Sequence, residues 1–377
     1  MLGATGSVGQ QTLDVVRAFP DRLKVVGLAA HTNHALLYQQ IEEFKPSLVS
    51  YAMEPVTAPA LANKKPVSAE EMASHPDVDV VVIATAGALA GLSVTLAAIK
   101  AGKSIAMANQ EVMLMAGPLL METARKHHAS LLPAHSALNA VWQCLQGEPG
   151  PVKRVILTAQ EGPFVPRSSE IGTRAMRQEV HKHPSRRMGR KAGVDAATLM
   201  SAGMQAILVS TMLGIPHQQV EVFLHPQGVV RTLVEFIDGS VKAVFSPPTH
   251  HLTLQYALSY PERWHSSEAP FLDLAEIGRL TFSPPDLAFY PCLASALTAG
   301  WMGGTAPTVL NAANEVAVLA YLDRQIGLTE VPEVIASVLH AHSVEDSPKR
   351  VVSLPSLDDI VQADAWAREE ARRQTVS

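Results

Sequence analysis

The sequence predicts an α/β fold in three parts: an N-terminal doubly wound parallel sheet, a central α+β domain with a mostly antiparallel sheet, and a C-terminal α-helical bundle. Three observations lead to this prediction. Short apolar runs first alternate with helix-like segments, polar and apolar residues then alternate singly, and the last segments are purely helical in pattern. We expect domains at 1–133, 134–258 and 288–377, with a connector at 259–287.

The N-terminal part repeats a strand–helix unit. Its apolar runs are too short for lone helices and are typical of strands buried on both faces. Such repeats give a parallel sheet with right-handed crossovers. We expect strands at 23–30, 47–52, 78–86 and 104–109, and helices at 10–19, 91–102 and 111–129.

The central and C-terminal parts follow other patterns. Segments 152–159, 220–226 and 229–245 alternate polar and apolar residues, and the Asp238–Gly239 turn predicts a hairpin in the last of them. Ser356 and Asp359 have the spacing of a capping box for the final helix. We expect covering helices near 137–146 and 194–213, and a bundle of helices at 293–303, 306–325, 331–342 and 356–373.

Composition excludes several classes of protein. The net charge of −5 leaves no basic surface for nucleic acid, and no apolar run reaches the ~20 residues of a membrane span. Two cysteines, Cys144 and Cys292, form neither a disulfide framework nor a zinc motif. We expect a cytoplasmic protein that acts on a small molecule.

The stretch MLGATGSVG places Gly3, Gly6 and Gly9 between an apolar start and a helix. In a Rossmann-type unit, such glycines permit a tight turn and let the backbone approach a pyrophosphate at the helix N-terminus. Only Met1 and Leu2 stand for the strand that should precede the turn, so we expect a clipped first strand. The predicted cofactor contacts here are Gly3, Thr5, Gly6, Ser7 and Val8.

The end of the second predicted strand reads AAHTN and contains no acidic residue. An NAD-specific enzyme would place a carboxylate there to hold the ribose hydroxyls. Thr32 and Asn33 occupy this edge, so NADP(H) is favoured over NAD(H). Alternatively, no ribose contact occurs there.

Five stretches of the chain together resemble a known family in their order and spacing: GATGSVGQQTLD, LLPAHSALNAVWQ, HPSRRMGRKAGVDAATLM, VEVFLHPQG and VLNAANEVAVLAYL. The chain resembles the 1-deoxy-D-xylulose 5-phosphate reductoisomerase family over almost its whole length. The resemblance implies an NADPH domain, a central catalytic domain, a helical domain, a homodimer, and a substrate that is isomerised and reduced with a divalent metal. It also implies cofactor contacts at Gly87, Asn109, Glu111 and Met188.

The resemblance breaks at the positions that it implies for the metal. His135 and Ala137 stand for an aspartate and a glutamate, with Ser136 kept between them, and Gln205 stands for a second glutamate. Hard divalent cations prefer carboxylate oxygens. We therefore expect no metal.

The positions implied for the substrate are also changed. Gln160, Ala196, Ser201 and Ala202 stand where the family holds the substrate phosphate, and Gln110 stands for a lysine near the reacting carbons. Hydrogen bonds to a charged group contribute about 1.5–3 kcal/mol each, so most of the phosphate affinity would be lost. The resulting candidate substrate contacts are Gln110, Ser136, Gln160, Arg186, Ser201 and Arg231, the last arginine standing for a histidine.

We therefore expect a metal-independent NAD(P)H oxidoreductase that transfers hydride on a different, anionic substrate. His135 or His183 would supply the proton, and Glu161 or Gln205 would assist. Alternatively, His135 is a hydrogen-bonded remnant, His183 lies in a basic surface loop, and Glu161 faces water. Two other functions stay open: a genuine reductoisomerase of the methylerythritol phosphate isoprenoid pathway, and an inactive cofactor-binding regulatory homologue.

Overall fold

The computed structural model describes residues 1–51, 66–160, 190–247, 249–265, 271–344 and 351–375. It confirms the α/β fold class. Contacts divide the chain into two compact units, each assembled from separate stretches. The three sequence domains proposed above stay a prediction. Unit 1 contains residues 1–113, 120–139 and 248–271, and unit 2 contains 114–119, 140–247 and 272–377.

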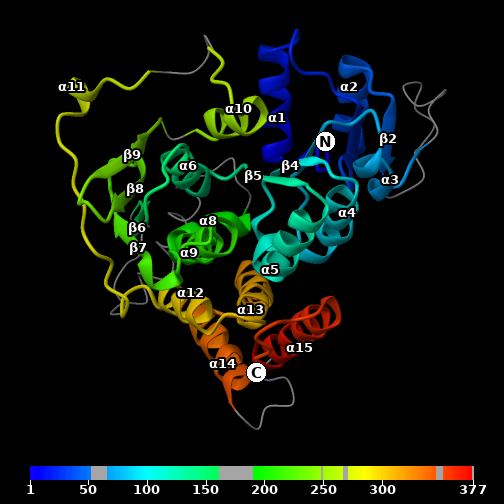
Figure 1. Ribbon diagram of the computed structural model, residues 1–377. Coiled ribbons are helices and arrows are strands. Elements are labelled where there is room, and N and C mark those ends of the chain that lie inside the picture. The colour runs from blue at the N-terminus through cyan, green and yellow to red at the C-terminus, as the bar shows by residue number, and fades with distance from the viewer. Residues whose placement is uncertain (52–65, 161–189, 248, 266–270, 345–350, 376–377) are drawn as a thin grey trace. The chain divides into compact units, whose positions relative to one another are not determined.

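Unit 1 is built on a parallel sheet (Figure 1). Leu2 bridges Ala29 on one side and Ile83 on the other, so the sheet runs β2-β1-Leu2-β3-β4-β5. The chain order reverses direction at Leu2, which makes this the topological switch point where α/β sheets bind ligands. The strands are β1 (Gly27–Ala30), β2 (Leu48–Tyr51), β3 (Val80–Ile83), β4 (Ser104–Met107) and β5 (Ser130–Pro133).

The first predicted strand, at 23–30, is shorter in the structure. It forms only over Gly27–Ala30, because the ladder with β2 begins at the pair Gly27 and Leu48. On the other side of β1, Leu2 supplies only an isolated bridge.

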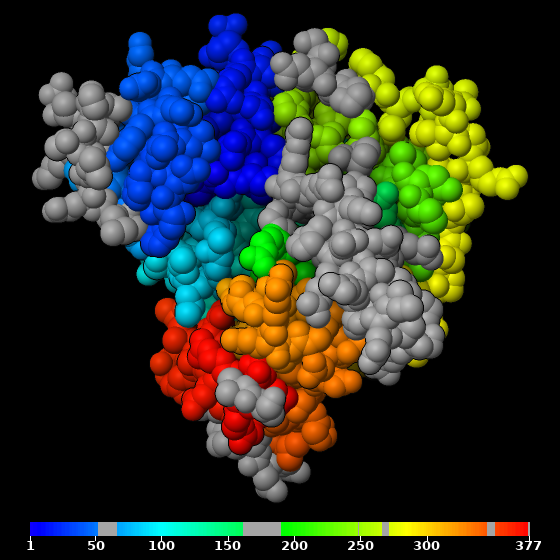
Figure 2. Space-filling model, turned by 180° about the vertical axis from the view of Figure 1, so that it is seen from behind, coloured from blue at the N-terminus to red at the C-terminus, as the bar shows by residue number. Residues whose placement is uncertain are grey.

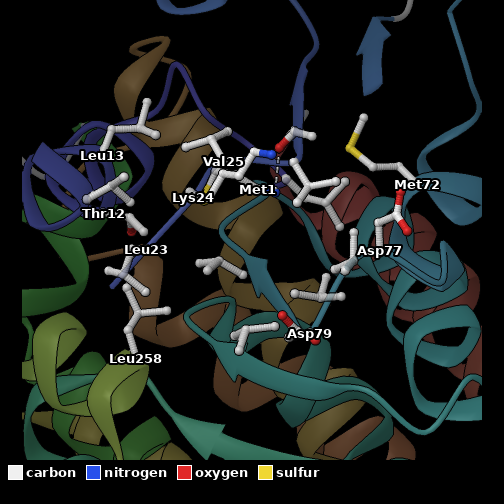
Figure 3. A pocket seen from close by; sticks show the side chains of 18 of the residues that line it. Met1, Thr12, Leu13, Leu23, Lys24, Val25, Met72, Asp77, Asp79 and Leu258 are labelled. Atoms are coloured by element: carbon white, nitrogen blue, oxygen red, sulfur yellow. Dashed lines mark hydrogen bonds between the residues drawn. The ribbon is translucent and has the colours of Figure 1, made fainter. Parts of the chain in front are cut away.

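A cavity of about 450 Å³ lies beside Met1 in unit 1 (Figure 3). Lys24 and Val25 line it near Met1, and Asp77 and Asp79 line it from the segment that leads into β3. The Met1 amino group donates a hydrogen bond to the Gly27 carbonyl at 2.9 Å. Burial lowers the pKa of this amino group from 8.0 to about 5, because a buried charge loses its hydration.

Helices pack on the sheet of unit 1. Val15 of the first helix and Leu254 of a helix from residues 251–259 share one apolar cluster with Val82, Ala106 and Ala134 from the strands and the segment after β5. The helices are α1 (Ser7–Ala18), α2 (His34–Phe44), α3 (Ala69–Ser74), α4 (Ala88–Lys100) and α10 (His251–Ser259), while α5 (Gln110–Lys126), kinked at Ala116, and α6 (Ser136–Leu145) continue into unit 2.

Unit 2 contains a four-stranded mixed sheet of order β7-β6-β8-β9. The β6–β7 pair is parallel, while β6–β8 and β8–β9 are antiparallel. The hairpin predicted at Asp238–Gly239 is confirmed, with Gly239 at φ 86°. The strands are β6 (Val152–Ala159), β7 (Val220–Leu224), β8 (Val230–Phe236) and β9 (Val241–Phe245).

The helix predicted at 194–213 is two helices, because Leu199 adopts a left-handed conformation (φ 56°) between them. The capping box is confirmed: the Asp359 amide donates to Ser356 Oγ, and the Ser356 amide donates to Asp359 Oδ2. The helices α13 and α15 lie side by side (Figure 2). The helices are α8 (Arg190–Ala197), α9 (Met200–Leu213), α11 (Leu274–Ile277), α12 (Pro291–Met302), α13 (Ala306–Leu322), α14 (Val331–Ser343) and α15 (Leu357–Thr375).

Within the described residues, no single helix is both long and apolar enough to cross a membrane. The bent pair of α8 and α9 passes that test by length and composition only.

Candidate functional site

The glycine turn of unit 1 is shaped by close backbone approaches. Gly3 has φ +84°, and a Cβ there would overlap the Ala84 carbonyl. A Cβ on Gly9 would overlap the Gly3 carbonyl, whereas one on Gly6 would meet only ordinary contacts. Gly3 and Gly9 are therefore required by the fold of the turn, and Gly6 leaves an exposed backbone that a ligand can approach.

The turn leads directly into α1. Gly6 is the N-cap residue, and no side chain among the described residues caps this end. The first amide groups of a helix lack partners within it and carry a partial positive charge. Ser7 and Val8 lie in the first turn of α1, so their amides are at the end of the helix that favours a phosphate, and their contact with a dinucleotide stays a prediction.

Asn109 and Glu111 hold the loop that follows β3. The Asn109 amide group donates to the carbonyls of Thr85 (2.8 Å) and Gly87 (3.1 Å), and its oxygen accepts from the Val112 amide. Glu111 accepts a hydrogen bond from the Gly87 amide at 2.9 Å. These two predicted cofactor residues thus shape a loop beside the glycine turn. Their direct contact with a cofactor stays a prediction.

The edge after β1 contains the two residues predicted to face the ribose. Thr32 and Asn33 are exposed, and Asn33 caps α2 by accepting from the Leu36 amide at 3.2 Å. An exposed neutral edge of this kind offers no charge that would repel a 2′-phosphate. The edge is therefore compatible with NADP(H), and the preference for NADP(H) over NAD(H) stays a prediction.

His135 lies between β5 and α6, at the carboxyl end of the sheet, and Ser136 begins the helix. Both are half-buried. The His135 ring lies 6.1 Å from the ring of His250, centre to centre, with the planes tilted by 59°. The sequence favours His250 and His251 as surface histidines, whereas both are half-buried in the structure.

Three predicted site residues of unit 2 lie just after β6 or on α9. Gln160 follows β6, donates to the Pro226 carbonyl at 3.4 Å, and packs against Gly228. Ser201 and Gln205 are four residues apart on α9, so they share one face, and both are half-buried.

Arg231 on β8 is a half-buried guanidinium held by neutral groups. Its Nε donates to Ser246 Oγ at 2.9 Å, and one Nη donates to the Pro247 carbonyl at 2.5 Å. Both of these partners are neutral oxygens, and no carboxylate of the described residues acts on its pKa. Burial lowers the pKa of Arg231. A desolvated cation without a counter-charge is costly, and an anionic ligand would relieve that cost.

Two further predicted site residues are half-buried, and four others lie outside the part of the chain that the structure describes. Gln110 is half-buried in the first turn of α5, and Thr5 is half-buried in the glycine turn. Glu161, His183, Arg186 and Met188 lie outside the described residues.

A glycine turn at the switch point of a parallel sheet, followed by a helix N-terminus without a side-chain cap, is typical of dinucleotide-binding oxidoreductases. Comparison with known proteins gives the particular family. The chain belongs to the 1-deoxy-D-xylulose 5-phosphate reductoisomerase family. The family model of that name matches residues 1–117, its C-terminal domain model matches 131–213, and the DXP reductoisomerase C-terminal domain model matches 245–370.

Individual relatives match along nearly the whole chain. The 1-deoxy-D-xylulose 5-phosphate reductoisomerase of Pelotomaculum thermopropionicum is 43% identical over 383 residues, which cover 98% of this chain and 96% of the relative. The Zymomonas mobilis enzyme in complex with NADPH superposes with a TM-score of 0.85 at 31% identity, covering 100% of this chain and 98% of that one. A DOX-P reductoisomerase in complex with NADPH, fosmidomycin and magnesium gives 0.87 at 34% identity, covering 99% and 97%.

These comparisons contradict the prediction of a different substrate and of metal independence. Relatives that match over their full length are named for 1-deoxy-D-xylulose 5-phosphate, and solved relatives contain magnesium. The prediction was wrong because it gave a handful of replaced side chains more weight than the agreement of the whole chain.

The residues at the implied metal positions nevertheless fit magnesium poorly. His135, Ala137 and Gln205 offer an imidazole, a methyl group and an amide, whereas magnesium takes carboxylate and water oxygens. Among the described residues, no group of three or more His, Cys, Asp or Glu side chains is placed to hold a metal ion. We derive no catalytic step through magnesium in this chain.

Proposed function

We propose that this chain is a genuine 1-deoxy-D-xylulose 5-phosphate reductoisomerase that isomerises its substrate and reduces it with NADPH, in isoprenoid biosynthesis. The observation that carries the proposal is the 43% identity over 98% of the chain to a relative of that name. The intact glycine turn and the free N-terminus of α1 support the cofactor part of it.

In this proposal the backbone of unit 1 binds the cofactor. The amides at the start of α1 hold the pyrophosphate, and Gly6 lets the cofactor approach because no Cβ projects there. Asn109 and Glu111 fix the Thr85–Gly87 loop, which faces the same end of the sheet. The acid–base role predicted for His135 stays a prediction.

Replacing Gly6 by alanine tests the cofactor site apart from the fold. Gly6 has φ −73°, which alanine adopts freely, and the added Cβ would meet protein atoms only at van der Waals distance. We expect Gly6→Ala to fold normally and to bind NADPH at least tenfold more weakly by calorimetry. Gly150→Ala is the matched control, because a Cβ there meets nothing within 4 Å. Equal affinity in both variants would contradict the cofactor site.

Activity itself is tested with purified protein, NADPH and 1-deoxy-D-xylulose 5-phosphate, in the presence of a divalent cation. We expect NADPH oxidation that depends on this substrate. NADPH binding without turnover would instead favour the inactive regulatory homologue.

We further propose that Arg231 contacts the substrate phosphate. Its guanidinium is half-buried, already oriented by Ser246 and Pro247, and has no acidic partner among the described residues. Arginine forks match the geometry of phosphate oxygens. The contact would compensate for the phosphate-binding residues that the sequence lacks.

We also propose a homodimer, as the family resemblance implies. Among the described strands, β9 is at the edge of its sheet, and it exposes Val241 (52%) and Phe245 (41%). An exposed apolar edge strand is a template for pairing with a second copy. Light scattering should give twice the chain mass. Val241→Lys should shift the protein toward monomer, because it places a charge on this edge strand. The cytoplasmic location stays a prediction.

A further inference from the structure

The helices α8 and α9 of unit 2 are joined by a turn that contains a strained residue. Leu199 has φ 56°, a left-handed conformation that leucine rarely adopts. Such residues persist only where the surrounding structure holds them, and they are frequent at functional sites. Ser201, a predicted substrate contact, lies in the first turn of α9 just after Leu199. We call residues 196–201 the α8–α9 turn and ask which contacts hold it.

A buried carboxylate at the end of α8 connects this turn to α13. Asn314 of α13 donates from Nδ2 to Asp195 Oδ1 at 2.8 Å, and both residues are buried. Lys191, one turn earlier on α8, donates from Nζ to Asp195 Oδ2 at 2.9 Å. A buried carboxylate is stable only when such donors replace its hydration. The residue that directly precedes the turn is therefore fixed through both of its carboxylate oxygens.

The far side of the turn is held by α12. Gly203 of α9 packs so closely on α12 that a Cβ there would lie 2.4 Å from the Ala296 Cβ. The buried Cys292 of α12 shares a side-chain hydrogen bond with Thr198, which belongs to the turn. The turn is thus held from α12 on one side and, through Asp195, from α13 on the other. Contacts from two packed helices are what a strained turn needs to keep one conformation.

Two asparagines one turn apart on α13 differ in what they hold. Asn311 and Asn314 are both almost completely buried. Neither amide atom of Asn311 has a hydrogen-bond partner among the described residues, whereas Asn314 holds Asp195. The same substitution at these two positions therefore separates loss of the bond to Asp195 from loss of a buried amide.

We propose that Asp195 and Asn314 are positioning residues: their hydrogen bond holds the α8–α9 turn in the conformation that binds the substrate. The proposal rests on the proposed function in assigning this turn to substrate binding. Neither residue touches the substrate or the cofactor in this proposal. Without the bond, Leu199 can leave its left-handed conformation and Ser201 is displaced, so substrate affinity should fall while NADPH affinity, which depends on unit 1, stays unchanged.

The first measurement needs no turnover. Amide hydrogen exchange of the full-length protein is followed by mass spectrometry in peptides that cover residues 196–204. We expect exchange there to be at least tenfold faster in Asn314→Leu than in the parent, and unchanged in the matched control Asn311→Leu. Unchanged exchange in a folded Asn314→Leu protein would overturn the proposal. An equal acceleration in β6 would also overturn it, because the bond would then stabilise the unit as a whole.

Kinetics then connect the turn to the substrate. Asn314→Leu should raise KM for 1-deoxy-D-xylulose 5-phosphate at least tenfold, with the calorimetric affinity for NADPH unchanged. The exchanged pair, Asp195→Asn with Asn314→Asp, keeps a hydrogen bond between an amide and a carboxylate and should recover most of this loss. An exchanged pair with the KM of Asn314→Leu would contradict the positioning role. If the parent protein does not turn over this substrate, the proposed function fails, while the exchange measurement still tests the bond.

Discussion

The predicted cofactor site and the predicted metal and phosphate site depend on different parts of the chain: the first on backbone geometry and the second on side chains. The cofactor end depends on backbone: positive φ at Gly3, close approach at Gly9, and the free amides of α1. The metal and phosphate end depends on side chains, and there the sequence has His135, Ala137 and Gln205 where the resemblance implies carboxylates. Backbone geometry tolerates few substitutions, whereas side-chain ligands can change singly without harm to the fold. The glycine turn therefore keeps the pattern that the resemblance implies, while the side chains at 135, 137 and 205 depart from it.

The largest effect should come from the glycine turn, where the cofactor part of the site depends on backbone geometry. Gly3→Ala should lower the free energy of unfolding by about 3 kcal/mol, because its Cβ would overlap the Ala84 carbonyl and its φ of +84° disfavours alanine. Thermal unfolding of Gly3→Ala and Gly6→Ala should therefore differ by many degrees. Similar melting temperatures would show that the turn relaxes more easily than its contacts indicate.

Restoring carboxylates probes the other end. The double variant His135→Asp, Ala137→Glu should bind Mg²⁺ about 30-fold more tightly, roughly 2 kcal/mol, because it supplies hard oxygen ligands at the turn between β5 and α6. A variant that folds but gains no Mg²⁺ affinity would show that these two positions do not face one ion.

Arg231→Gln gives the smallest expected effect. It should raise KM for 1-deoxy-D-xylulose 5-phosphate about tenfold, roughly 1.4 kcal/mol, with kcat little changed, because a ground-state contact to phosphate is lost. Arg231→Lys should recover part of the loss. If KM is unchanged while stability falls, Arg231 serves only to hold Ser246 and Pro247.

The sequence predicted the elements whose signals are local. The hairpin at Asp238–Gly239, the capping box at Ser356 and the glycine turn each depend on a few adjacent residues, and all three form as predicted. The break at Leu199 was missed because leucine at positive φ leaves no trace in an apolar pattern. The pairing of His135 with His250 was missed because it depends on how α10 packs against the sheet.

Function was misjudged for a related reason. Side-chain replacements at His135 and Gln205 gave a local argument for new chemistry, while the whole-length agreement with reductoisomerases argued for the family reaction. The residues at a few positions show which side chains are present. They do not show which cation or substrate the folded site selects.

The most direct test of the central claim traces the hydride. NADPH carrying deuterium at the transferable position is incubated with the protein, 1-deoxy-D-xylulose 5-phosphate and Co²⁺ or Mg²⁺, and the phosphorylated product is examined by mass spectrometry and NMR. We predict a rearranged, reduced product that carries one deuterium. Recovery of unchanged substrate, by a protein that binds NADPH and is folded, would contradict the assignment of this chain as a reductoisomerase.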